Sequence, residues 1–200
     1  MADSDGSSSS RPRPGGRSAR VVAAAHAAAL EVLRDVGYDG LQLADVAKRA
    51  GVNKTTVYRR WPTKAALVGD LMAQFTRSAV ATPDTGALQS DLELLLTEIA
   101  DALEDRAVRA VLYAALAAGD SNDDILAART GFWAERFARS GEIVERACLR
   151  GELPVGVDPR TFLEMASGPI YFRALFSDDD VDRRFIEEVA ARIVRGYRAD

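Results

Sequence analysis

The segment 41–67, LQLADVAKRAGVNKTTVYRRWPTKAAL, constrains the fold of this chain more than any other stretch. Within it a small residue, Ala47, is followed four positions later by Gly51 and ten positions later by Val57. A small side chain lets two helices cross closely, and glycine tolerates the positive φ that a tight turn requires. A branched aliphatic residue at the third position fastens the two helices at a steep angle. This order predicts a helix-turn-helix motif.

The second helix of this motif carries polar side chains that suit nucleic acid. Its exposed positions combine hydroxyl groups with cations, the chemistry that binds phosphates and base edges. Lys54 and Arg59 are long enough to reach guanine edges. The candidate DNA-contacting residues are Gln42, Lys54, Thr55, Thr56, Tyr58, Arg59, Arg60 and Lys64. Helix packing is the alternative role for Thr56 and Tyr58, and a solvated surface is the alternative for the cations.

The charge of the chain is divided unevenly along its length. The net charge is −4, which by itself argues against a nucleic-acid partner. Residues 1–64, however, hold 11 Lys and Arg against 6 Asp and Glu, whereas residues 65–200 hold 15 against 24. This distribution indicates a basic, DNA-facing part joined to an acidic body.

Residues 17–80 resemble the DNA-binding domain of TetR-type transcriptional regulators. The residues that carry the resemblance are Gly37-Tyr38, Val46-Ala47, Ala50-Gly51-Val52, Val57-Tyr58, Trp61 and Lys64. The resemblance implies an all-α homodimer that binds double-stranded DNA at a palindromic operator. It also implies that a small molecule bound to the C-terminal part releases the operator.

The chain departs from the usual pattern of this family at three places. Gln42 and Leu43 stand where the family usually has Thr or Ser, which removes the expected cap of the first motif helix. Ala25 and His26 replace a bulky aliphatic pair in the helix before the motif. Trp61 replaces the usual Phe and is expected to serve as the same apolar plug.

Hydrophobic periodicity predicts about nine helices and no strand. Three of them, expected over 18–36, 43–50 and 54–60, form the DNA-binding domain, in which Val22, Ala25, Ala29, Val32, Leu33 and Val36 of the first helix face the core. Asn53 is the expected N-cap of the third helix, Gly37 ends the first, and Thr63 is a possible cap of a fourth helix, 63–80. The later helices are expected over about 88–103, 108–116, 123–149, 160–176 and 181–197, with breaks at 119–122, 151–160 and 177–180 and possible bends at Gly131 or Gly141.

This pattern predicts three parts of the chain. Residues 1–16 are a Ser-rich, basic tail of low complexity that is expected to be disordered. Residues 17–64 form the helix-turn-helix domain, which the fourth helix connects to the rest. Residues 81–200 form an α-helical domain for effector binding and dimerisation.

A single recognition helix reads only a few base pairs, so specific binding requires two copies about one DNA turn apart. The chain is therefore expected to form a homodimer with twofold symmetry. The last two helices carry more large apolar residues than an edge helix needs, although a purely intramolecular core is the alternative. The dimer-interface candidates are Phe162, Phe172, Phe176, Phe185, Val189 and Ile193.

An effector pocket is expected between the helices of residues 86–176. Aromatic side chains are few in this chain, so those in the C-terminal half are informative. The pocket candidates are Leu96, Leu112, Tyr113, Leu116, Phe132, Trp133, Phe137, Met165 and Tyr171. Such a lining suits a small apolar or aromatic effector, and ordinary core packing is the alternative for each residue.

The sequence argues against an enzyme and against a membrane protein. The single histidine, His26, excludes a histidine cluster for zinc, and neither a glycine-rich phosphate loop nor a Cys/His metal spacing occurs. We therefore expect no catalytic residue, no metal and no cofactor. The single cysteine, Cys148, cannot form an internal disulfide, and no apolar run has the length of a membrane span. A cytoplasmic location without membrane contact is expected.

Three functions are compatible with these observations. The first is a repressor released by a small-molecule effector. The second is a regulator that binds no small-molecule effector and is controlled by a protein partner. The third is an all-α ligand carrier that retains a vestigial DNA reader.

Overall fold

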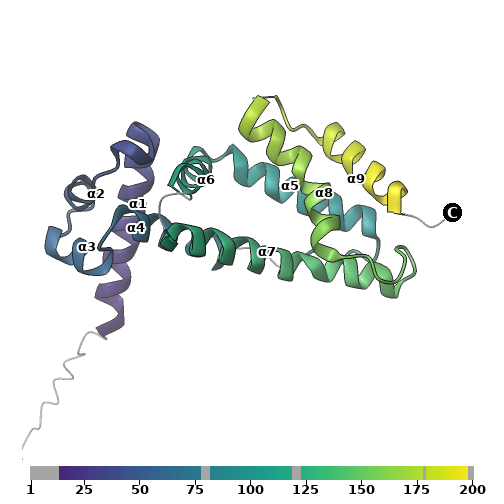
Figure 1. The fold of residues 1–200 in the computed structure, drawn as a ribbon, viewed down its shortest axis with the longest axis horizontal. Coiled ribbons are helices and arrows are strands. Elements are labelled where there is room, and N and C mark those ends of the chain that lie inside the picture. The colour runs from purple at the N-terminus through teal and green to yellow at the C-terminus, as the bar shows by residue number, and fades with distance from the viewer. Residues whose placement is uncertain (1–13, 78–81, 119–122, 178, 198–200) are drawn as a thin grey trace, which may run out of the picture.

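The computed structural model describes residues 14–77, 82–118, 123–177 and 179–197. Within these ranges the chain forms nine α-helices and one π-helical turn, η1, without a strand, which confirms the predicted all-α fold (Figure 1). The helices are α1 (Pro14–Gly40), α2 (Leu43–Arg49), α3 (Lys54–Arg60), α4 (Lys64–Arg77), α5 (Leu88–Glu104), α6 (Arg106–Ala118), α7 (Asp123–Leu149), α8 (Pro159–Phe172), η1 (Arg173–Ser177) and α9 (Arg183–Tyr197).

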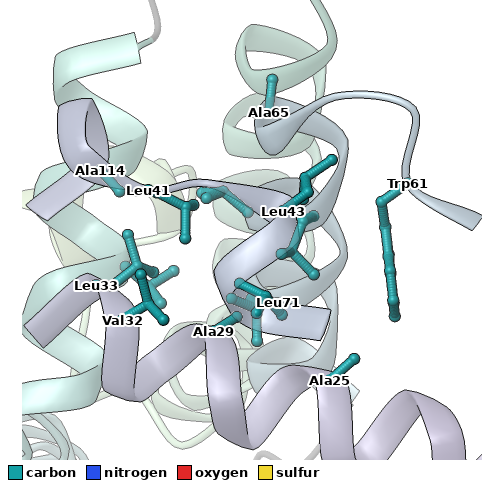
Figure 2. Close-up of a cluster of buried hydrophobic side chains, with 14 of the residues drawn as sticks. Ala25, Ala29, Val32, Leu33, Leu41, Leu43, Trp61, Ala65, Leu71 and Ala114 are labelled. Carbon is teal, nitrogen blue, oxygen red and sulfur yellow. The ribbon is translucent and has the colours of Figure 1, made fainter. Parts of the chain in front are cut away.

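The N-terminal lobe packs α1 to α4 around a core of small and aliphatic side chains. Ala29 and Leu33 of α1, Ala47 of α2 and Val57 of α3 belong to this core, and all four are at most 3% exposed. Figure 2 shows this core and places Ala114 of α6 at its edge. The core of the N-terminal lobe therefore continues into a helix that lies far along the chain.

The first helix differs from its predicted range of 18–36. It begins at Pro14, inside the predicted disordered tail, of which residues 1–13 lie outside the described part of the chain. Gly37 has a φ of 67° and breaks the helical path, as expected for a glycine at the helix end. Val36, predicted to face the core, is 54% exposed because the chain turns at the next residue.

The turn between α2 and α3 has the geometry that the motif predicts. Gly51 adopts a φ of 63°, which lets the chain reverse within a few residues. Asn53 caps α3, since its Oδ1 accepts a 2.8 Å hydrogen bond from the Thr55 amide. Thr63 caps α4 in the same way, because its Oγ1 accepts a 3.1 Å bond from the Ala66 amide. Both predicted caps are confirmed.

The C-terminal lobe packs α5, α7, α8 and α9 around a second core in which Leu92 and Phe162 are fully buried. Figure 1 shows α7 running along this lobe with α8 crossing it, while α9 packs against α5 and α8. The buried Asp91 fixes the loop before α5, because its Oδ1 accepts bonds of 2.6 and 2.7 Å from the amide and hydroxyl of Thr85. Arg150 Nη2 lies 3.6 Å from the other carboxylate oxygen.

The remaining helices match their predicted ranges with small differences. α7 is continuous through Gly131 and Gly141. The helix predicted over 160–176 is α8 up to Phe172 and continues as the π-helical turn η1. The predicted break at 119–122 and Asp178 of the acidic turn lie outside the described residues. No helix in the described ranges is both long enough and apolar enough to span a bilayer.

Candidate nucleic-acid interface and ligand cavity

The recognition helix α3 presents a polar face away from the core of the lobe. Val57 is fully buried, which fixes the rotation of the helix and turns the neighbouring side chains outward. The exposed candidates on this helix are Lys54, Thr55, Tyr58, Arg59 and Arg60. Thr56 is half-buried, so packing occupies part of its surface. The outward face of α3 therefore carries two hydroxyl groups and three cationic side chains within two helical turns.

Gln42 and Lys64 flank this helix in different ways. Gln42 is exposed at the N-cap position of α2, and its side chain makes no capping hydrogen bond there. Lys64 is half-buried and donates to the carbonyl oxygens of Tyr38 and Asp39 at 2.9 and 3.2 Å. Its ammonium also lies 4.4 Å from the centre of the Tyr38 ring. Two of its three N–H groups thus join α4 to the end of α1.

A polar cluster behind α3 holds the C-terminal end of that helix. Oδ2 of Asp70 on α4 accepts hydrogen bonds from Nε1 of Trp61 at 3.0 Å and from Nε2 of His26 at 3.1 Å. His26 is only 4% exposed, and its other ring nitrogen, Nδ1, contacts Oε1 of Gln74. Arg60 lies near the same carboxylate, with its Nη2 3.9 Å from Oδ2 of Asp70. Its Cζ is 5.4 Å from the centre of the Trp61 ring. Arg60 is therefore shared between this cluster and the outward face of α3.

An apolar cavity of about 160 Å³ lies between the two lobes. Met72 and Phe75 of α4 form one wall, and α5, α6, α7 and α8 supply the others. The pocket candidates Leu112, Phe132 and Tyr171 line it. Its only charged lining groups among the described residues are Glu98 and Arg136. Burial raises the pKa of Tyr171, an effect that the charge of Arg136 opposes, so its hydroxyl stays protonated near neutral pH.

A second hollow opens beside this cavity, between α7 and α8. Trp133, Phe137 and Tyr171 line both an outer groove of about 420 Å³ and a narrow gap of about 20 Å³ beneath it. The pocket candidate Leu96 lines the narrow gap. The ring of Trp133 packs edge-on against Tyr171 at 5.4 Å between centroids and stacks on Phe137 at 5.9 Å. Tyr171 belongs to all three spaces and so separates the outer groove from the inner cavity.

Three pocket candidates lie away from these spaces. Tyr113 is 44% exposed on α6, and its hydroxyl donates a 2.8 Å hydrogen bond to the carbonyl of Leu175. Leu116 and Met165 are 50% and 51% exposed. Tyr113 lines a separate open hollow of about 630 Å³ between α1 and α6. Hydrophobicity alone did not distinguish the outward positions of Leu116 and Met165 from lining positions, because the rotation of each helix depends on its packing partners. Met72 and Phe75 of the connecting helix α4 also line the inner cavity, outside the range 86–176 in which the sequence predicts the pocket.

The dimer-interface candidates divide into buried and exposed groups. Phe162 and Val189 are 0% and 7% exposed, so they belong to the core of their own chain and offer no surface to a second copy. Phe185 is half-buried beneath the guanidinium of Arg173, 3.5 Å from the ring centre, and Ile193 is half-buried against the same core. The two remaining candidates, Phe172 and Phe176, are 62% and 70% exposed and stack on each other at 6.0 Å.

Comparisons with known proteins agree with this geometry in both lobes. Residues 26–71 match the family model described as bacterial regulatory proteins, tetR family, and residues 82–193 match that of the tetracyclin repressor-like C-terminal domain. The chain is 29% identical over 169 residues to the HTH-type transcriptional regulator AqdR of Rhodococcus erythropolis, covering 84% of this chain and 81% of AqdR.

Two further relatives extend the likeness over most of the chain. The DNA-binding transcriptional repressor TetR of Mycobacteroides abscessus is 30% identical over 182 residues, which cover 86% of this chain and 93% of that protein. The structure of FadR from Bacillus subtilis in complex with stearoyl-CoA superposes with a TM-score of 0.67 and 21% identity, over 87% of this chain and 98% of FadR. With a helix-turn-helix whose polar face is exposed and a family model covering each lobe, the chain belongs to the TetR family of DNA-binding transcriptional regulators.

Proposed function

We propose that this regulator is a repressor that binds a palindromic operator as a homodimer and releases it when a small apolar or aromatic effector fills the inner cavity. The M. abscessus relative is described as a repressor, which supports this direction of control. FadR, which has the same fold, was solved with stearoyl-CoA, so this fold is compatible with a ligand that has an apolar tail.

The observation that carries the proposal is the position of α4 in the cavity wall. Met72 and Phe75 line the cavity, while Lys64 at the other end of the same helix is bonded to the end of α1. α4 also follows α3 after three residues, 61–63. A ligand that separates the walls of the cavity therefore displaces a helix that is tied at its N-terminal end to the DNA-reading lobe.

Release of the operator then follows from a shift between two populations. The DNA-bound state requires the two α3 helices of a dimer to lie about one DNA turn apart, roughly 34–36 Å. An effector that binds more tightly to a state with another spacing lowers DNA affinity by the difference in its binding free energies. The effector needs no contact with α3 for this effect.

The exposed side of α8 and η1 supplies the proposed dimer contact. Met165, Phe172 and Phe176 recur at intervals of seven and four residues, which places them along one side of these helices. Exposed large apolar residues on one side of a helix favour burial against another protein. A second copy can cover them by packing the same helices across a twofold axis.

The first test is a selection of binding sites from a random DNA pool with the full-length protein at near-physiological salt. Enrichment of a palindrome with half-sites about one helical turn apart is expected. A parallel selection with the double variant Lys54→Ala/Arg59→Ala is the control, and its enriched pool is expected to lose the palindrome. Absence of enrichment by folded, dimeric wild-type protein would overturn the proposal in favour of the partner-dependent regulator or the carrier.

A further inference from the structure

The lining of the inner cavity includes a cation, Arg136, that forms no ion pair with a carboxylate of the described residues. Arg136 of α7 is half-buried and lines both the cavity and the narrow gap beside it. Its guanidinium lies 6.0 Å from the centre of the Phe132 ring. In the described part of the chain, no carboxylate lies within 4.0 Å of it, whereas Arg139, one turn further along, pairs with Glu135 at 3.3 Å. Arg136 is thus a charged group directed at an apolar space.

The hydroxyl of Tyr171 lines the same cavity. It makes no hydrogen bond to another described residue, and burial keeps it protonated, so it can donate one. Arg136 and Tyr171 line both the cavity and the narrow gap beside it, which places the two groups near each other. Together they present donors from a guanidinium and a phenol, the arrangement that binds a carboxylate through charge-assisted hydrogen bonds.

The size of the cavity limits what accompanies the carboxylate. A dry, apolar cavity of about 150 Å³ in a protein core accommodates one benzene ring. The present cavity has about 160 Å³ and is lined by Ile99, Leu103, Leu112 and Phe132 among other apolar residues. One aromatic ring or a short aliphatic chain therefore fits, with its acidic group at Arg136.

Glu98 is the opposing charge in the cavity lining. Within the described residues it makes no ion pair with Arg136 or with another basic group. Glu98 favours a cationic ligand, whereas Arg136 favours an anionic one. Tyr171 also lines the narrow gap together with Arg136, whereas Glu98 does not, so its donor reinforces the site for an anion.

We propose that the effector of this regulator is a small aromatic or short-chain carboxylic acid, whose carboxylate binds Arg136 and Tyr171 and whose apolar part fills the cavity against α4. This inference rests on the proposed function for the regulatory consequence of binding. The binding chemistry itself is independent of DNA and can be tested without an operator.

The test uses three probes of the same size that differ in head-group charge, namely 3-phenylpropanoate, 3-phenylpropan-1-ol and 3-phenylpropylamine. Isothermal titration calorimetry with the full-length protein measures the affinity of each. A hydrogen bond to a charged group contributes about 1.5–3 kcal/mol, so the acid is expected to bind about ten- to a hundredfold more tightly than the alcohol. Equal affinities for acid and alcohol, a preference for the amine, or no binding of any probe would overturn the proposal.

Variants separate a specific site from a general attraction. Arg136→Gln is expected to remove the preference for the acid while leaving the affinity for the alcohol unchanged. Arg129→Gln is the matched control, because Arg129 lies on the same helix but lines only the outer groove. Circular dichroism confirms that both variants are folded. If Arg129→Gln removed the preference and Arg136→Gln did not, the carboxylate site would lie in the outer groove instead.

A separate DNA-binding measurement distinguishes this inference from the proposed function. Acid binding through Arg136 that leaves operator affinity unchanged would retain the carboxylate site and overturn effector-controlled release. Operator release by the alcohol, with no advantage for the acid, would retain the proposed function and overturn the carboxylate site.

Discussion

A single carboxylate oxygen satisfies two buried donors behind the recognition helix. His26 and Trp61, two positions at which the chain departs from its family's usual residues, lie 5.5 Å apart between ring centroids and share Oδ2 of Asp70. A buried polar group without a partner costs about 1–3 kcal/mol, so the two ring N–H groups require this acceptor. The two departures are therefore linked through Asp70, on which both ring donors depend.

The replacement Trp61→Phe tests this dependence. The ring that plugs the core is retained, while the indole N–H that donates to Asp70 is lost. The free energy of unfolding is expected to fall by about 1 kcal/mol, as measured by urea denaturation followed by circular dichroism. An unchanged stability would show that water replaces the indole donor at no cost.

The exposed cation Arg59 is expected to contribute directly to DNA binding. Arg59→Ala should weaken operator affinity by about tenfold or more and reduce its salt dependence, because either a base-edge or a phosphate contact is lost. Fluorescence anisotropy at several salt concentrations measures both effects. Arg183→Ala on α9, also exposed, is the control and should leave both unchanged. Equal effects of the two substitutions would contradict a role for the outward face of α3.

At the scale of elements, α8 and η1 expose three large apolar side chains along one side, those of Met165, Phe172 and Phe176. Phe172→Ser/Phe176→Ser should shift the protein toward the monomer, because this double change removes the two stacked rings proposed to be covered by the partner. Sedimentation velocity measures the assembly state. Leu149→Ser provides the control, since Leu149 is 88% exposed at the end of α7. A double variant that stays dimeric would place the interface elsewhere.

The start of α8 depends on a charged cap. Asp158 Oδ2 accepts bonds of 2.8 and 2.6 Å from the amide and hydroxyl of Thr161, and these hydrogen bonds, the hydroxyl's first, lower the pKa of Asp158. A carboxyl group whose pKa is lower in the folded than in the unfolded protein adds to the free energy of unfolding at pH values above its unfolded-state pKa. This contribution is lost as the pH falls through the folded-state pKa. The stability advantage of wild type over Asp158→Ala should therefore be largest near neutrality and shrink below about pH 4.

Chemical denaturation of both proteins between neutral pH and the acid limit of folding measures this difference. The control is Asp182→Ala, which removes the equivalent carboxylate that accepts a 2.8 Å bond from the Phe185 amide before α9. A wild-type advantage that grows on acidification would contradict the assigned sign.

In the whole molecule, α4 contacts helices of both lobes and crosses α7 at close range. A Cβ placed on Gly69 would lie 3.1 Å from the Cβ of Ala128, whereas a Cβ on Gly131 meets nothing within 4 Å. Gly69→Val should therefore push α4 away from α7 and lower operator affinity in the absence of effector, by the same displacement that we propose for ligand binding. Gly131→Val is the matched control and should leave DNA affinity unchanged. Anisotropy titrations compare the two, and wild-type affinity in Gly69→Val would contradict coupling through α4.

The sequence alone determined the local structure of the reading lobe. The spacing of Ala47, Gly51 and Val57 fixes the turn because only a small residue and a positive-φ residue are sterically allowed there. Asn53 and Thr63 are identifiable as caps because capping depends on residues three or fewer positions away. The outward direction of Arg59, two positions after Val57, follows from the helical period once Val57 faces inward.

Only the tertiary structure decided which helices share a core and which residues face the cavity. The sequence places the start of the C-terminal domain at residue 81, yet α6 completes the N-terminal core through Ala114, and α4 forms a wall of the inner cavity through Met72 and Phe75. Burial of Phe162 and exposure of Phe172 are likewise set by neighbouring helices. Hydrophobicity and period define the apolar side of each helix, but the rotation and partner of that side depend on contacts between residues distant in sequence.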